Sequence, residues 1–177
     1  YNCAPMIDLW HQDCDNIIGD RSFGDDVDLV TQLGRFAIKG LKKSAINPIM
    51  KHIPGHGLAK CDSHLSLPQI DHDVSFLMKN DFKIFQNLKN EANIAMTAHI
   101  VYSKIDYLPA TISQKTINFI REEIGFKNLL ITDDLSMKAL SGNVSKNSEL
   151  ALKAGCDILL HCNGDMKEMK EINNFLS

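Results

Sequence analysis

The feature that most constrains the fold of this chain is a regular alternation of short apolar runs with longer amphipathic stretches. The apolar runs have the length of strands, and the longer stretches carry apolar residues at helical spacing. Strands that are separated by helices pair in parallel through right-handed crossovers. The sequence therefore predicts an α/β fold that is either doubly wound or a barrel. The expected strands are residues 4–9, 46–51, 94–99, 129–133 and 158–161.

The amphipathic stretches predict five helices, with Asp25 or Asp26 as the N-cap of the first and Gly125 and Gly155 closing the third and fourth. One segment breaks the alternation, because residues 52–73 are rich in Pro, Gly, Asp and His. A loop of this length favours a functional role over a simple connection. The expected helices are residues 25–43, 74–88, 113–123, 148–154 and 166–176.

Length and charge limit the classes of protein to which this chain can belong. Its 177 residues suit one domain, and the net charge of −3 comes with basic residues spread along the chain. That pattern disfavours a general nucleic-acid binder. No apolar run approaches the ~20 residues of a membrane helix. The five cysteines form no C-x-x-C pair, so we expect neither a disulfide framework nor a zinc ribbon, and a reducing cytosol is the expected compartment.

Polar side chains gather where the predicted strands end. In parallel α/β folds the ligand lies at the carboxyl ends of the strands. A single histidine at such a position is more often a structural hydrogen-bonding group, but several strands contribute here, which favours a site. The residues are Asp8, Lys51, His52, His99, Asp133, Asp134 and His161.

The loop after the second predicted strand holds two patterns that suit a polar ligand. Its first turn contains a proline and two glycines, and Lys51 and His52 precede it as donors for hydroxyl or carbonyl groups. Further on, Asp62 stands two residues before His64, so its carboxylate can fix which ring nitrogen faces a substrate. Both patterns also occur in ordinary turns.

Two more positions allow a chemical or a purely structural reading. Asp133 ends a buried strand, where barrel enzymes place nucleophiles and metal ligands, yet either it or Asp134 can cap a following helix. Arg21 can grip a carboxylate or sugar hydroxyls, or form a surface ion pair. Dinucleotide, nucleoside triphosphate and zinc-protease motifs are absent from the sequence.

Taken in order, five motifs closely resemble those of the bacterial β-N-acetylglucosaminidases of glycoside hydrolase family 3. The resemblance covers nearly the whole chain. It implies a cytoplasmic, retaining glycosidase without cofactor or metal that releases N-acetylglucosamine from anhydro-N-acetylmuramyl peptides during peptidoglycan recycling. The implied partners are carbohydrates, not nucleic acid or membrane. The motifs are Gly19-Asp20-Arg21-Ser22-Phe23-Gly24, Lys51-His52-Ile53-Pro54-Gly55-His56-Gly57, Asp62-Ser63-His64, Met96-Thr97-Ala98-His99 and Thr132-Asp133-Asp134-Leu135-Ser136-Met137.

The resemblance also implies roles for individual residues. Asp133 matches the nucleophile that forms a covalent glycosyl-enzyme, His64 matches the acid/base, and Asp62 matches the partner that orients its imidazole. The residues that match the grip on the N-acetylglucosamine unit are Arg21, Lys51 and His52. Retaining glycosidases usually pair two carboxylates, so a histidine in the proton-transfer role is a peculiarity of this subgroup.

Length separates this chain from the family pattern. Complete family domains are (β/α)₈ barrels of about 250 residues, whereas about five of the eight units are recognisable here. We therefore expect residues 1–177 to be the C-terminal part of such a barrel, with the true N-terminus upstream of Tyr1, and the chain alone to be inactive.

Two alternatives to a family 3 glycosidase remain open from the sequence. The first is a metal-dependent hydrolase with zinc surrounded by His52, His99, Asp133 and the histidines of the long polar loop. The second is a truncated barrel that binds sugar without hydrolysing it.

Overall fold

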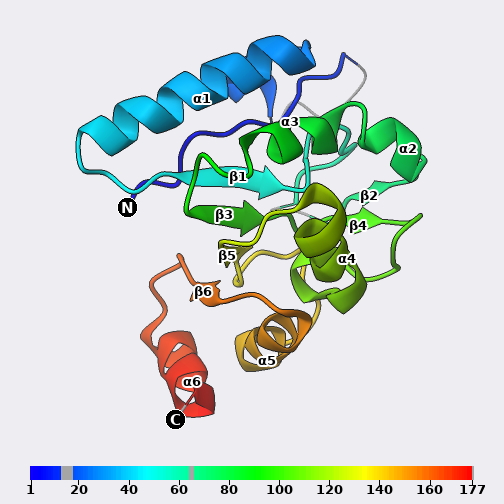
Figure 1. The fold of residues 1–177 in the computed structure, drawn as a ribbon. Coiled ribbons are helices and arrows are strands. Elements are labelled where there is room, and N and C mark those ends of the chain that lie inside the picture. Colours follow the sequence, from blue (N-terminus) through cyan, green and yellow to red (C-terminus); the bar gives the residue numbers. More distant parts are fainter. Residues whose placement is uncertain (13–17, 64–65, 177) are drawn as a thin grey trace.

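The computed structural model describes residues 1–12, 18–63 and 66–176, and its centre is a parallel four-stranded sheet (Figure 1). The strands are β1 (Ile49–Ile53), β3 (Ile94–Thr97), β5 (Leu129–Asp134) and β6 (Ile158–Leu160), in the order β1-β3-β5-β6. All three pairings are parallel. The α/β prediction is therefore confirmed, and the described strands form an open sheet and not a closed barrel.

The predicted strand at residues 4–9 is wrong as a regular strand. The segment runs beside β1 but meets it only at isolated bridges, between Asn2 and Pro48 and between Met6 and Lys51. The backbone N–H of Ile7 donates to the carbonyl of Lys51 at 2.9 Å. Pro5 has no N–H to donate, so a continuous ladder cannot form across it. The segment still covers the edge of β1.

A second, two-stranded parallel sheet was not expected from the sequence. It joins β2 (Gln69–Ile70), within the long polar loop, to β4 (Val101–Tyr102), which follows β3. Strands of two residues are too short to produce a readable alternation of apolar and polar positions. This small sheet fastens the far end of the loop to the segment after β3.

Three of the predicted helices end at the expected C-terminal residue. Helix α1 (Val27–Lys43) begins after Asp26, whose side chain accepts from the N–H of Leu29 at 2.8 Å. Helix α5 (Val144–Ala154) ends at Gly155, which has a φ of 111°, but it begins four residues earlier than predicted because Asn143 caps it. Helix α6 (Met166–Leu176) has the predicted bounds.

The other two predicted helices are interrupted. Residues 74–88 form two helices, α2 (Val74–Leu77) and α3 (Asp81–Leu88), separated at Asn80, whose φ and ψ of −120° and −104° are not helical. Residues 113–123 form α4 (Gln114–Phe119) and then a π-helical turn, η3 (Ile120–Ile124), which Gly125 ends with a φ of 79°. Two short 3₁₀ helices, η1 (Gly19–Arg21) and η2 (Ala110–Ile112), complete the described elements.

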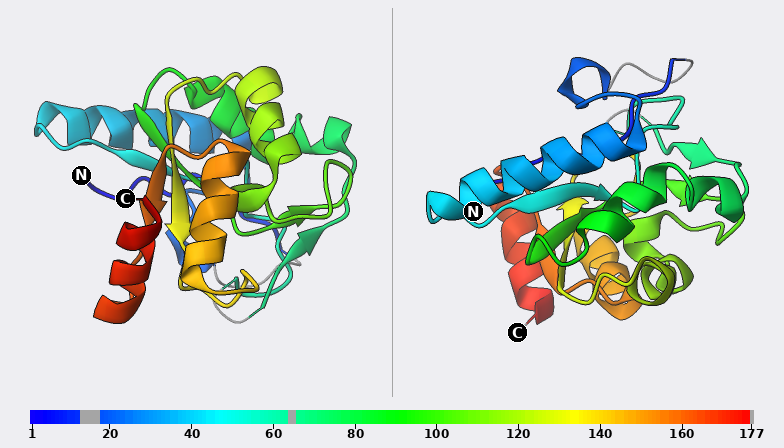
Figure 2. Two further views of the ribbon diagram at one scale, coloured as in Figure 1. Left: turned by 90° about the horizontal axis from the view of Figure 1, so that it is seen from below. Right: turned by 45° about the horizontal axis from the view of Figure 1, so that its top comes forward.

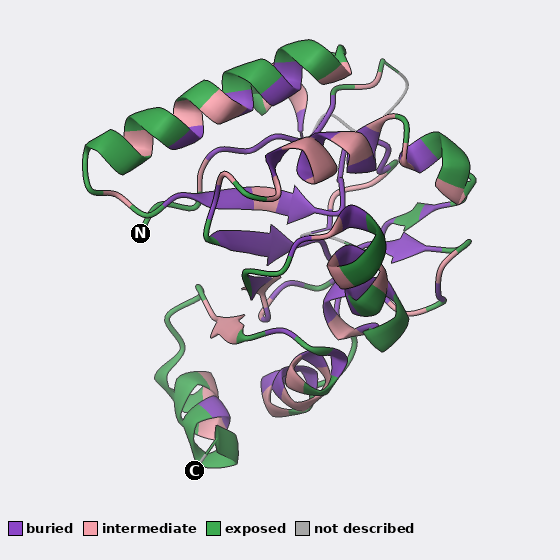
Figure 3. Ribbon diagram, viewed as in Figure 1, coloured by how far each residue is buried: buried purple, intermediate pink, exposed green. Residues whose placement is uncertain are grey.

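Both faces of β1 and β3 are largely buried, as their mostly purple ribbons in Figure 3 show, whereas β6 is half-buried. Alternate residues of a strand point to opposite faces. Met50, Ala95 and Leu130 belong to the main core, while their neighbours Ile49, Ile94 and Ile131 form a second, smaller cluster. On the main-core side, α1 packs on α3 and α4 packs on α5, while α6 lies beside α5 near β6 (Figure 2).

None of the described helices is long and apolar enough to cross a membrane.

Candidate active site

The carboxyl ends of the central strands bring two of the predicted site residues together. His52 lies in β1 and Asp133 lies near the end of β5, and the Nε2 atom of His52 is 3.9 Å from an Oδ2 atom of Asp133. Lys51 is close enough for its charge to lower the pKa of Asp133. The strand-end rule thus located Lys51, His52 and Asp133 at one site.

Asp8 is the organising carboxylate of this site, and the sequence analysis gave it no role. Its side chain is fully buried and accepts three kinds of hydrogen bond. The Nδ1 atom of His52 lies 2.7 Å from Oδ2, the backbone N–H of His52 lies 3.1 Å from the same atom, and the backbone N–H of His56 donates to Oδ1 at 2.8 Å. Burial raises the pKa of Asp8, but His52 and the other donors outweigh it and lower the pKa below its usual value.

Asp133 is an ionised carboxylate in a mostly enclosed position. Burial raises its pKa, but the charges of His52 and Lys51, together with the backbone N–H of Asp134 at 2.9 Å, lower the pKa below its usual value. The side chain keeps 15 % of its surface exposed. A negative charge that is poorly hydrated and still accessible can attack an electrophilic carbon or stabilise a developing positive charge.

The neighbouring Asp134 has a structural role instead. Its carboxylate accepts from the N–H of Ser136 at 3.0 Å, from the Ser136 hydroxyl at 2.7 Å and from the N–H of Cys162 at 3.0 Å. The expectation that one of the two aspartates caps a helix is wrong, because turns follow and α5 begins only at Val144. Asp134 caps a turn and ties it to the segment after β6.

His99 follows β3 and has both ring nitrogens engaged. Nε2 lies 3.0 Å from the carbonyl oxygen of Asp134, and Nδ1 lies 2.7 Å from the hydroxyl of Thr111. A carbonyl can only accept, so Nε2 carries the proton, while the Thr111 hydroxyl beside Nδ1 also lies 3.2 Å from the carbonyl oxygen of Ala98. Burial lowers the pKa of His99. This histidine is therefore a neutral support for the Asp134 backbone.

The metal-dependent alternative receives no support from this geometry. It needs His52, His99 and Asp133 around one ion, but neither nitrogen of His99 is available to bind a metal. Within residues 1–12, 18–63 and 66–176, no group of three or more His, Cys, Asp and Glu side chains is placed to hold a metal ion.

The remaining predicted residues belong to η1 and to the long polar loop, and one of them is outside the described residues. Arg21 is exposed at the end of η1. Asp62 is half-buried, and its backbone carbonyl accepts from the N–H of Ser66 at 3.0 Å. His64 is outside the described residues, so the expected pairing of Asp62 with His64 stays a prediction. Ser63, which stands between them in sequence, lies with its hydroxyl 3.3 Å from Nε2 of His56.

A layer of buried contacts holds the turn at residues 54–58, which links His52 to His56. The Tyr102 hydroxyl donates to the Gly55 carbonyl at 2.7 Å. Gly57 packs directly on the chain after Asp8, since a Cβ atom there would lie 1.9 Å from the carbonyl oxygen of Leu9. Below the turn, buried Asp81 meets Nε2 of His11 at 3.2 Å through both carboxylate oxygens. The sequence analysis assigned no role to Asp81 or His11.

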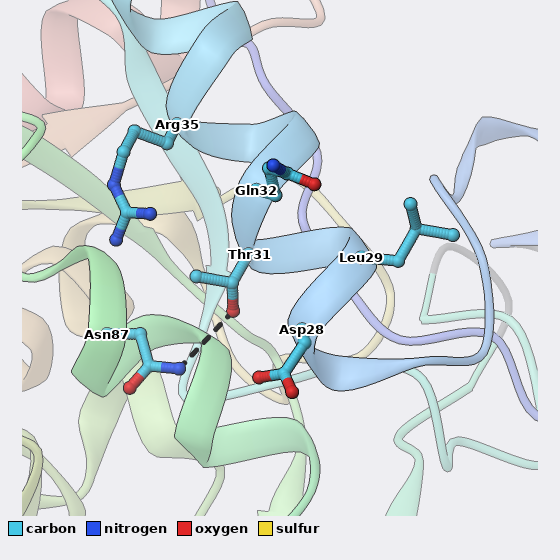
Figure 4. A pocket seen from close by; sticks show the side chains of 6 residues that line it. All are labelled: Asp28, Leu29, Thr31, Gln32, Arg35 and Asn87. Atoms are coloured by element: carbon cyan, nitrogen blue, oxygen red, sulfur yellow. Dashed lines mark hydrogen bonds between the residues drawn. The ribbon is translucent and has the colours of Figure 1, made fainter.

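A groove of about 650 Å³ lies elsewhere, between α1 and α3 (Figure 4). Among the residues lining it, Asn87 donates to the Thr31 hydroxyl at 3.4 Å, and Arg35 pairs with Glu91, just after α3, at 2.9 Å. The lining side chains stand on the two helices and not at the strand ends. We place the candidate active site at Asp133, where the ionised carboxylate and the imidazole of His52 meet.

Fold and site together define a class: a parallel α/β protein with an ionised, partly exposed carboxylate at the carboxyl ends of its strands, the place where barrel enzymes carry their active sites. The particular family follows from comparison with known proteins. Residues 1–177 match the model of the glycosyl hydrolase family 3 N terminal domain, and the chain belongs to this family.

Individual relatives agree with this family. A beta-hexosaminidase from Glaesserella parasuis is 38 % identical over 165 residues, which are 90 % of this chain and 48 % of that protein. The structure of NagZ from Neisseria gonorrhoeae superposes with a TM-score of 0.87 at 34 % identity, over 98 % of this chain and 51 % of that one. The same NagZ has been solved in complex with N-trifluoroacetyl-D-glucosamine.

A third relative is zinc-bound CbsA from Thermotoga neapolitana, with a TM-score of 0.90 at 32 % identity, over 98 % of this chain and 38 % of that one. The chain thus spans about half the length of the beta-hexosaminidase and of NagZ.

Proposed function

We propose that this chain belongs to a β-N-acetylglucosaminidase that releases non-reducing-end N-acetylglucosamine from β-1,4-linked anhydro-muropeptides. The observation that carries the proposal is the ionised Asp133 carboxylate beside His52 at the strand ends. The relatives support it, since they are named beta-hexosaminidase and one structure holds an N-acylated glucosamine. A role in peptidoglycan recycling in the cytoplasm is part of the same proposal.

The proposed reaction is a retaining double displacement. An Oδ atom of Asp133 attacks the anomeric carbon while the bond to the leaving oxygen breaks, and His64 gives that oxygen a proton. His64 then takes a proton from water as the water attacks the glycosyl-aspartate ester, and Asp133 leaves as a carboxylate. Asp62 orients the His64 imidazole, which titrates in the range that both steps need.

The proposed grip on the sugar comes from three residues. Lys51 and His52 lie side by side in sequence on β1, next to Asp133, where an ammonium and an imidazole can bind sugar hydroxyls. Arg21 can reach the same unit from η1, and its guanidinium offers several donors at once.

We also propose that residues 1–177 form the C-terminal part of the catalytic barrel domain. The four described sheet strands form an open sheet, and the residues of β6 are only half-buried, so this edge can accept further structure. The length of the relatives is consistent with additional barrel units elsewhere in the protein.

An assay of both lengths tests the function and the domain assignment together. We expect the full gene product to hydrolyse an aryl β-N-acetylglucosaminide, to ignore the matching aryl β-glucoside and to keep its rate after chelation. The 177-residue chain alone is expected to show no turnover, because the catalytic groups need sub-ångström positioning from a complete barrel.

Sugar binding by calorimetry without turnover of the full product would favour the sugar-binding alternative. Loss of the rate on chelation, with recovery on adding zinc, would favour the metallohydrolase.

His64→Ala is expected to affect substrates according to their leaving group. A poor leaving group needs protonation, so its kcat/KM should fall by about 10²- to 10⁴-fold. An activated aryl group needs little protonation and should lose much less in the first step. Kinetics on a series of aryl glycosides checks this, with Asp62→Asn as a milder version of the same pattern. Equal losses across the series would remove His64 from the acid role.

A further inference from the structure

We propose that Asp8 is a positioning residue that keeps a proton on Nδ1 of His52 and so turns Nε2 of that ring toward Asp133 and the substrate. The inference rests on the proposed function, in which His52 binds the sugar and Asp133 is the nucleophile. It adds a residue outside the reacting groups and outside the motifs that carried the family resemblance.

The contacts of Asp8 determine which ring nitrogen of His52 carries the proton. Its carboxylate is ionised and can only accept, so the Nδ1 atom 2.7 Å away must donate. The backbone N–H groups of His52 and His56 fix both carboxylate oxygens, which prevents the carboxylate from turning away. Because Asp8 is fully buried, no water competes for these positions. Asp8 therefore fixes the orientation of the His52 ring through its contact with Nδ1.

The other nitrogen of His52 then faces the reaction side. Nε2 lies 3.9 Å from Oδ2 of Asp133. With the proton of the neutral ring on Nδ1, Nε2 is left to accept a hydrogen bond from a sugar hydroxyl. Asp8 thereby acts on the substrate side of the ring without touching the substrate. Among the described residues, the other ionisable groups facing this pair are Lys51, His56, His99, Asp134 and Cys162.

An Asp8→Asn substitution reverses this arrangement with no change in size. The amide oxygen must take the place of Oδ1, because the N–H of His56 donates there. The NH₂ group then replaces Oδ2 and faces Nδ1 of His52, where two donors cannot meet. His52 must give up its Nδ1 proton and place its proton on Nε2. An amide in place of the carboxylate behind a serine-protease histidine has this effect on the tautomer, which is a known case in a different fold.

Nitrogen NMR of the full gene product with ¹⁵N-labelled histidine reads the tautomer directly. In the neutral ring of His52 we expect the proton on Nδ1 in the wild type and on Nε2 in Asp8→Asn. A wild-type ring with its proton on Nε2 and none on Nδ1 would overturn the proposal, whether or not the variant folds. This measurement does not use turnover, so it stays informative if the protein fails to hydrolyse an aryl N-acetylglucosaminide and the proposed function falls.

The split between KM and kcat gives the second readout. With the proton moved to Nε2, the neutral ring of His52 can no longer accept from a sugar hydroxyl, so substrate binding should weaken. KM for the aryl N-acetylglucosaminide is therefore expected to rise by a larger factor than kcat falls. At neutral pH we expect a loss in kcat/KM of about 10- to 100-fold, the usual cost of removing a residue that orients another.

Asp81→Asn is the matched control. Asp81 is also a buried aspartate bonded to a histidine beneath the same turn, but that histidine is His11, and the described contacts do not link it to Asp133. We expect this variant to lose stability while the His52 tautomer and KM stay unchanged. If both variants raised KM equally, a general loosening of the turn would explain the result and the specific role of Asp8 would be wrong.

Discussion

Asp133→Asn is expected to lower kcat/KM of the full gene product by about 10⁴-fold, or about 5 kcal/mol of transition-state stabilisation. The amide has no negative charge with which to form a glycosyl ester, and the surrounding cations would then face a neutral group. Steady-state kinetics on an activated aryl N-acetylglucosaminide measures the loss. Asp133→Ala should regain turnover with azide, which enters from the vacated side and gives the glycosyl azide.

Asp134→Asn is the control for this experiment. Its carboxylate holds Ser136 and Cys162, so its loss should weaken the turn and cost far less activity. A 2-deoxy-2-fluoro or 5-fluoro sugar should label the Asp133 peptide. A label on Asp134 would contradict the assignment. The absence of any label, together with tight binding of a thiazoline analogue, would favour participation of the substrate's own acetamido group.

Gly57→Ala is expected to destabilise the full gene product by at least about 3 kcal/mol. The new methyl group would lie 1.9 Å from the carbonyl oxygen of Leu9 and 2.9 Å from an Oδ1 atom of Asp81. The first contact is with backbone, so the segment carrying Asp8 would have to move. Urea unfolding, followed by circular dichroism, measures the change in the free energy of unfolding.

Gly40→Ala serves as the control for this substitution. Gly40 lies on the exposed side of α1 with nothing within 4 Å of the added methyl group. Alanine in a helix should raise stability by up to about 1 kcal/mol. Equal unfolding energies for the two variants would show that the turn at residues 54–58 is not packed as described.

Periodicity predicted the fold class because strands and helices bury their apolar residues at different spacings. It failed where distant contacts decide local structure. Residues 74–88 have a continuous helical pattern, yet the helix breaks at Asn80, next to Asp81, whose side chain bonds with His11 from a segment 70 residues away. The predicted start of α5 at residue 148 is wrong, although asparagine is a common N-cap residue and Asn143 indicates the true start.

The strand-end rule located Lys51, His52 and Asp133 because parallel strands deliver their carboxyl ends to one edge. The sequence places Asp8 at a strand end too but indicates no role for it, because its partners His52 and His56 are 44 and 48 residues away. One available signal was an aspartate inside an otherwise apolar run, a position that requires hydrogen-bond partners when buried.

The order of the strands in the four-stranded sheet has a consequence for synthesis on the ribosome. The order β1-β3-β5-β6 follows the order of the chain, so each strand of this sheet pairs with the strand of the same sheet that precedes it in the chain. Each of these pairings therefore joins consecutive strands of the sheet, and none has to wait for a strand from a later part of the chain. A nascent chain that has emerged as far as Asp134 already contains three of the four strands and can bury them before β6 is translated. Each later unit then docks on a finished surface, which shortens the time during which apolar strand faces are open to aggregation.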